Sequence, residues 1–128
     1  MTPDLVWLVW AAVLAFVQVL VAALGRMQQV GLPALAGNRE GLPEASGWAG
    51  RAQRAHANMM ENLPLFIILV VAAHLAGKAD GVALTGCAVF FWARLAHAVV
   101  YVAGIAWLRT LCWAASVVGM VMILTHIL

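Results

Sequence analysis

Residues 51–76 read RAQRAHANMMENLPLFIILVVAAHLA, a polar half followed directly by an apolar half. On an α-helix, at roughly 100° per residue, four side chains of the polar half fall within an arc of about 80°. They are Arg51, Arg54, Asn58 and Glu61. The apolar half indicates that this helix enters a membrane, where charged groups are costly, so we expect the stripe to face a protein interface or a wet cavity. The stripe is therefore a candidate functional site.

The composition places the whole chain in a membrane. Of its 128 residues, 66% are hydrophobic and 9% are charged, and the mean hydropathy is +0.99, which is unlike an ordinary soluble domain. The net charge of +2 is too small to favour nucleic acid as a partner. Cys87 and Cys112 lie in apolar segments, where we expect them to pack rather than to form a disulfide. We predict one integral membrane domain over residues 1–128.

Four apolar segments are each long enough to cross the roughly 30 Å hydrocarbon core of a bilayer. They cover about residues 5–26, 52–76, 82–102 and 107–128. The predicted fold class is all-α, a membrane four-helix bundle, and so small a bundle favours oligomers with a cavity between subunits. Residues 28–50 are rich in glycine and proline and should form a loop, and Pro64 should kink the second helix. Gln18, alone in the first segment, should hydrogen-bond to a neighbouring helix.

The basic residues predict an orientation. With four spans, the first loop and the third turn lie on one side of the membrane, and all six arginines belong at or near that side. These are Arg26, Arg39, Arg51, Arg54, Arg94 and Arg109. Lys78 alone marks the other side. We expect the arginine-rich loop in the cytoplasm and both termini outside.

A second polar stripe lies on the third span, where Arg94, His97 and Tyr101 fall within about 60° of one another on a helix. Both stripes are expected at one depth, and Arg109 begins the fourth span at that level. The expected site is lined by five arginines with one local acid: Arg26, Arg51, Arg54, Arg94, Arg109 and Glu61. Arginine binds carboxylates in a bidentate manner and stays charged in an apolar site, so this excess predicts a polar, carboxylated ligand.

Each of these residues also has a plainer interpretation. Arg26 can serve as an interfacial cation at a helix C-terminus instead of an anion contact. Arg54 and Glu61, seven residues apart, can form a structural ion pair instead of holding a ligand. Tyr101 can hydrogen-bond to a thiolate or oxyanion, or it can anchor the helix at the membrane interface. His56, His74 and His126 lack metal-ligand spacing and lie off the stripes, so no metal is expected.

The pattern R-x-x-R-A-H-x-N-x-x-E-N-x-P at residues 51–64 resembles the signature of the MAPEG family, the membrane-associated proteins in eicosanoid and glutathione metabolism. The pattern of Arg94, His97 and Tyr101 followed by Arg109 is similar to the family's third-span pattern. The resemblance covers essentially the whole chain. It implies a homotrimer of four-helix subunits that binds glutathione between neighbouring subunits at the cytoplasmic side.

By the same resemblance, Arg54, Asn58 and Glu61 would hold glutathione, with Arg94, His97 and Tyr101 beside it. Arg109 is the nearest match to the arginine that stabilises the glutathione thiolate in the family. A lipophilic second substrate would approach from the bilayer, and no metal is implied.

Asn62 stands where some eicosanoid-forming relatives have an aromatic residue, and the short loops resemble those of bacterial members. The expected activity is therefore a detoxifying glutathione transferase or peroxidase in a bacterial inner membrane. Two alternatives from other classes remain: a non-catalytic lipid-binding scaffold of the same family, and a small transporter. Retention of Arg54, Asn58 and Glu61 argues against the scaffold, and the absence of broken, repeated helices argues against the transporter.

Overall fold

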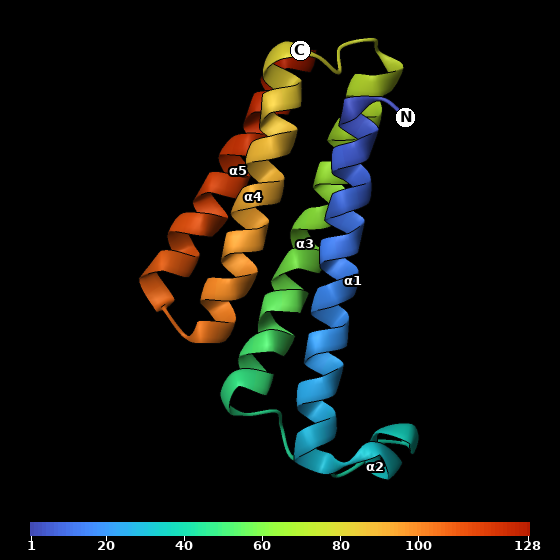
Figure 1. Cartoon of the computed structure of the whole chain (residues 1–128), viewed down its shortest axis with the longest axis vertical. Helices are drawn as coiled ribbons and strands as arrows, with labels where there is room; N and C mark the ends of the chain where they lie inside the picture. Colours follow the sequence, from blue (N-terminus) through green and yellow to red (C-terminus); the bar gives the residue numbers. More distant parts are fainter.

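The computed structural model describes all 128 residues as five helices without strands. Four are long: α1 (Pro3–Val30), α3 (Gly47–Leu75), α4 (Gly81–Ala103) and α5 (Ala106–Ile127). Each is long and apolar enough to cross a membrane. The expected all-α four-helix bundle is confirmed. Both termini lie at one end, and the α1–α3 connection lies at the other (Figure 1).

The helix boundaries differ from the expected ones mainly in the first connection. The helix α1 continues to Val30 because residues 26–30 contain no helix breaker before Gly31, which has a φ of 84°. The short helix α2 (Leu32–Ala36) then occupies part of the expected loop, and α3 begins at Gly47, several residues early. The helix α3 is continuous through Pro64. The loop is thus shorter than the span of residues 28–50.

The core of the bundle is built from apolar side chains of all four long helices. Phe66 of α3 stacks on Phe90 of α4 with ring centroids 4.0 Å apart, and both are fully buried. The helices α4 and α5 approach most closely at Gly86 and Gly119, where a Cβ on Gly86 would lie 2.6 Å from the Gly119 carbonyl oxygen. The outer surface remains largely apolar, as expected for a surface in contact with lipid. Cys87 and Cys112 are free thiols, in agreement with their predicted packing role.

The expectation for Gln18 is wrong. Its side chain is buried between the helices, but it makes no hydrogen bond, and its Oε1 atom has no partner in the chain. The side chains around Gln18 on the neighbouring helices are apolar: Ala52 and Ala55 on α3, and Leu95, Ala98, Val99 and Val102 on α4. No polar group of the bundle therefore meets the amide.

Candidate functional site

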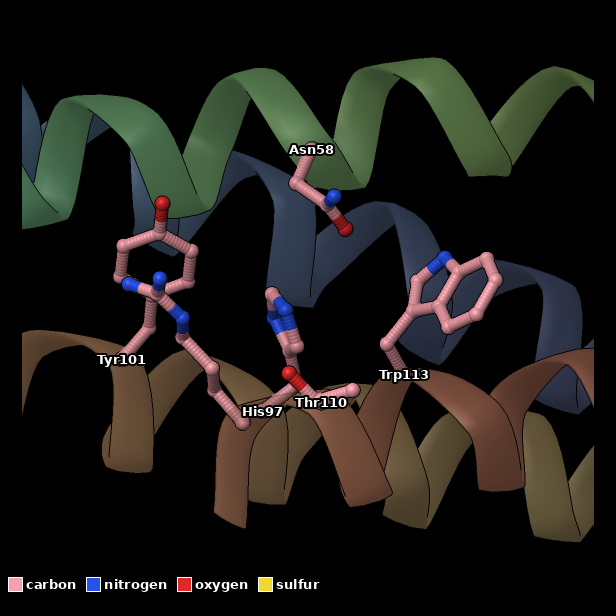
Figure 2. Close-up of a pocket in the computed structure, with 6 residues that line it drawn as sticks. Asn58, His97, Tyr101, Thr110 and Trp113 are labelled. Carbon is pink, nitrogen blue, oxygen red and sulfur yellow. The ribbon is translucent and has the colours of Figure 1, made fainter. Parts of the chain in front are cut away.

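A polar pocket of about 270 Å³ lies between α3, α4 and α5. Figure 2 shows Asn58 pointing into it from α3, His97 and Tyr101 from α4, and Thr110 and Trp113 from α5. Arg109 completes the lining. The structure therefore brings four predicted site residues to one place: Asn58, His97, Tyr101 and Arg109.

The turn between α4 and α5 positions Arg109. Gly104 ends α4 with a left-handed φ of 86°, and its amide donates to the carbonyls of Val100 and Tyr101. Glycine adopts this conformation at little cost, so the chain can reverse at once. The reversal places the Arg109 guanidinium carbon 4.5 Å from the centre of the Tyr101 ring, a cation–π contact. The rings of His97 and Tyr101 pack edge to face, with their centroids 5.4 Å apart.

Arg94 lies behind the pocket wall. Arg94 is only 1% exposed, and its NH2 group donates a hydrogen bond to Asn58 Oδ1 at 2.9 Å. Its Nε and NH1 groups, and Nδ1 of His97, are buried without a hydrogen-bond partner in the chain. Buried polar groups are nearly always paired, so these unpaired atoms distinguish the polar layer from the apolar core of the bundle. Asn62 supports the arrangement by donating to the Asn58 backbone carbonyl at 2.8 Å.

Within one chain, the other predicted arginines lie outside this pocket. Arg26 and Arg54 line a separate pocket of about 550 Å³ beneath the first connection, together with Arg39. Arg26 donates to the Pro43 carbonyl, and Arg51 Nε donates to the Val102 carbonyl at 2.9 Å. Helical spacing predicts a shared face but not which neighbouring helix that face meets.

Arg54 and Glu61 do not form the ion pair considered above. Both are exposed, and the two ion pairs of the chain join His74 to Asp4 and His126 to Asp80. Glu61 lines neither polar pocket. Within one chain, the face that carries Arg54 and Glu61 is therefore unpartnered.

Thr110 and Trp113 also line the pocket, although the sequence analysis did not predict them as site residues. Trp113 follows Arg109 by four residues, so helical spacing alone places it on the same face of α5. Thr110 carried no such signal. The pair of buried Asp4 and partly exposed His74 was also missed, because its members are 70 residues apart in the sequence.

The family model for the MAPEG family matches residues 5–128, essentially the whole chain. The chain belongs to the MAPEG family. A search of curated proteins found no match. The MAPEG family includes glutathione transferases and peroxidases as well as non-enzymatic members, and it is a membrane family. Together with its four apolar helices, this membership identifies the chain as an integral membrane protein.

Proposed function

We propose that this MAPEG protein is a membrane-bound glutathione transferase that activates the glutathione thiol for attack on a lipophilic electrophile. The observation that supports the proposal most directly is the pocket of Asn58, His97, Tyr101 and Arg109, with Arg94 behind it. These side chains offer hydrogen-bond donors and positive charge at membrane depth. A cation beside a thiol favours the thiolate, which is the nucleophilic form.

The proposed roles follow from position. Arg109 and the Tyr101 hydroxyl stabilise the thiolate sulfur, while Asn58 and His97 hold the adjoining part of the peptide. In the conjugation of an aryl halide, the sulfur–carbon bond forms and the carbon–halogen bond breaks. The halide leaves with the bonding electron pair, and the thiol proton passes to water.

The remaining arginines support a subunit-shared site. Small-molecule pockets span about 300–1,000 Å³, and the pocket in one chain is about 270 Å³, which is small for a tripeptide. Arg26, Arg51, Arg54 and Glu61 are therefore proposed to complete the glutathione site in a homotrimer, where a neighbouring copy covers the exposed face of α3. Arg26 and Arg54 suit the two carboxylates of glutathione, and Glu61 suits its ammonium group.

The cellular setting is proposed on the same basis. A bacterial-type enzyme in the inner membrane, with its glutathione site facing the cytoplasm, would meet the thiol on one side and lipophilic electrophiles in the bilayer. Conjugation and peroxide reduction are both compatible with an activated thiolate. No metal is needed for either reaction.

Glutathione titration of the purified protein by calorimetry, followed by conjugation of an aryl halide, tests the proposal. Arg109→Ala should lower kcat roughly a hundredfold, the scale of one lost transition-state donor. Arg54→Ala should raise Kd by roughly tenfold or more, with a smaller effect on kcat. Lys78→Ala, at the opposite end of the bundle, is the matched control. Absence of binding at millimolar glutathione would contradict the proposal.

A further inference from the structure

The pocket between α3, α4 and α5 has a charged end and an aromatic end. Arg109 and Tyr101 lie beside the α4–α5 turn, where the guanidinium packs on the tyrosine ring. Trp113 follows Arg109 by four residues on α5, which places it roughly 6 Å further along the helix and away from the turn. Figure 2 shows the His97 ring between Tyr101 and Trp113. The α5 wall of the pocket therefore runs from a cation to an indole.

The indole N–H of Trp113 is a hydrogen-bond donor without a partner in the chain. The side-chain hydrogen bond that involves this residue goes from the Ser116 hydroxyl to the Trp113 backbone carbonyl, at 2.6 Å. Trp113 is 41% exposed, and none of the packed aromatic pairs of the bundle includes its ring. Figure 2 shows the edge of the indole that carries the nitrogen turned toward Asn58 and the inside of the pocket. Since an indole N–H donates but cannot accept, it suits an oxygen atom of the bound molecule.

The depth of Trp113 separates it from an ordinary interfacial tryptophan. Trp107 has the position of an interfacial anchor, because it is 85% exposed and lies in the first turn of α5. Trp113 lies nearly two turns deeper, roughly 9 Å along the helix, and lines the polar pocket. The hydrocarbon of a bilayer supplies no acceptor for its N–H at that depth. Trp113 is thus placed to meet a substrate that enters the pocket.

We infer that Trp113 is a catalytic residue that donates its indole N–H to the carbonyl oxygen of the second substrate, and that this substrate is a lipophilic conjugated enone or enal. This role rests on the proposed function, in which Arg109 and Tyr101 hold the thiolate sulfur. Reacting atoms meet at roughly 3–3.5 Å, and an oxyanion donor lies roughly 2.7–3.1 Å from its oxygen. A conjugated carbonyl compound that lies along α5 can place its β-carbon at the sulfur and its oxygen at Trp113.

The reaction is a conjugate addition. The thiolate forms a bond between sulfur and the β-carbon, the electron pair of the carbon–carbon double bond shifts toward the carbonyl, and negative charge collects on the carbonyl oxygen. This charge develops in the transition state, so a donor already placed at that oxygen accelerates the step. Water then protonates the α-carbon, and the hydroxide that remains neutralises the proton released when the thiol ionised. No group leaves.

Other electrophiles place their negative charge elsewhere. In a displacement on an alkyl iodide, the charge goes to the departing iodide. In the reduction of a hydroperoxide, it goes to the oxygen that leaves next to the sulfur. Neither reaction places an oxyanion at the aromatic end of the pocket, so the indole N–H should favour the conjugated carbonyl compound over both.

The test compares a long-chain conjugated enone with an alkyl iodide of equal chain length, with glutathione and the purified protein in nanodiscs. The rate enhancement over the uncatalysed reaction should be larger for the enone. Trp113→Phe keeps an aromatic wall but removes the donor. It should lower the ratio of kcat/KM for the enone to kcat/KM for the iodide roughly ten- to a hundredfold, the scale of one hydrogen bond to a charged group. Trp107→Phe, the same change at an exposed position outside the pocket, is the matched control and should leave the ratio unchanged.

An unchanged ratio in Trp113→Phe would overturn the inference and leave the proposed transferase intact. So would equal rate enhancements for the two substrates in the wild-type protein, a comparison that needs no variant to fold. Trp113→His regains a ring N–H and should restore part of the ratio, which a purely structural role of Trp113 would not produce. A wild-type protein that turns over neither electrophile would contradict the proposed function, and the inference with it.

Discussion

Arg94 is the residue that ties the polar site to the core. A buried guanidinium loses its hydration, so the hydrogen bonds that it keeps are worth more than ordinary ones. The one bond found for Arg94 goes to Asn58, which also lines the pocket. Asn58 therefore acts as an anchor for a buried charge and as a pocket wall at once.

Replacing Asn58 tests this double role. Asn58→Leu should lower the free energy of unfolding by about 1.5–3 kcal/mol, the range for a hydrogen bond to a charged group. Asn58→Asp should retain the bond and lose less. Thermal unfolding in detergent, followed by circular dichroism, measures both changes. Asn38→Leu is the matched control, since Asn38 is exposed in the first connection. An unaltered melting temperature for Asn58→Leu would show that Arg94 is satisfied without Asn58.

The ring and the hydroxyl of Tyr101 have separate proposed roles, which two substitutions can distinguish. Phenylalanine keeps the aromatic face on which Arg109 lies, whereas leucine removes it. If the hydroxyl stabilises the thiolate as proposed, Tyr101→Phe should lower kcat roughly tenfold or more at unchanged stability. Tyr101→Leu should lower both kcat and the melting temperature. Conjugation kinetics beside thermal unfolding separate the two effects, and wild-type turnover in Tyr101→Phe would remove the hydroxyl from the mechanism.

At the scale of the helices, the contact of α4 with α5 depends on two glycines. A Cβ on Gly119 would lie 2.7 Å from the Gly86 carbonyl oxygen and 2.8 Å from the Phe90 amide nitrogen. Gly119→Ala should therefore force the helices apart and cost about 1–3 kcal/mol of stability. It should also disturb the pocket, because α4 and α5 form two of its walls. Gly37→Ala is the control, because its Cβ would meet nothing closer than 3.6 Å. Equal melting temperatures for the two variants would refute the close contact.

Two histidine–aspartate pairs secure the end of the bundle that holds the termini, and they differ in exposure. His74 Nδ1 lies 2.8 Å from Asp4 Oδ2, and the Asp4 side chain is 3% exposed. His126 Nε2 lies 2.9 Å from Asp80 Oδ1, and the Asp80 side chain is 78% exposed. His74→Ala should cost about 1.5–3 kcal/mol because it removes the ion-pair partner of a buried carboxylate. His126→Ala should cost about 0–1 kcal/mol. Chemical denaturation in mild detergent measures the loss of stability in both variants. A larger loss for His126→Ala than for His74→Ala would show that the burial of the aspartate does not determine the strength of the pair.

The long helices could be predicted because each contains one long apolar run, and glycine-containing turns separate these runs. Hydropathy does not report where a helix frays or stops, so the extension of α1 to Val30 and the existence of α2 were missed. Gln18 shows a second limit. A buried amide usually finds a partner on the next helix, but the residues opposite it turned out to be alanines and branched aliphatics. Which side chains meet across an interface depends on helix rotation, which hydropathy does not determine.

At the scale of the whole molecule, the stripes on α3 and α4 predicted a polar layer, and one chain distributes its residues over two pockets. Asn58, His97, Tyr101 and Arg109 meet in one pocket, while Arg26 and Arg54 line another. Helical spacing correctly placed residues on faces. It did not show that residues of the same α3 stripe meet different neighbours. Asn58 contacts Arg94 of α4, whereas Arg54 lies beneath the first connection. The sequence pattern alone cannot separate a site within a subunit from one shared between subunits.

The orientation of the bundle is the last prediction. Figure 1 shows the α1–α3 connection at one end of the molecule and both termini at the other. The first connection and the residues that flank it carry Arg26, Arg39, Arg51 and Arg54, whereas the connection between α3 and α4 carries Lys78 alone. Positive residues in short loops are retained in the cytoplasm, so this asymmetry predicts an inward first connection and outward termini.

A fluorescent protein that folds only in the cytoplasm, and a phosphatase that is active only outside it, report the orientation. After Leu128 the phosphatase should be active and the fluorescent protein dark, and the reverse should hold for insertions after Gly41 in the first connection. Replacing Arg39 and Arg51 by alanine while adding two lysines after Leu128 should shift the chain toward the opposite orientation, because the excess of positive residues on the inner side becomes smaller. A fluorescent C-terminal fusion of the native sequence would contradict the prediction and would also place the polar pocket outside the cytoplasm, away from its proposed thiol.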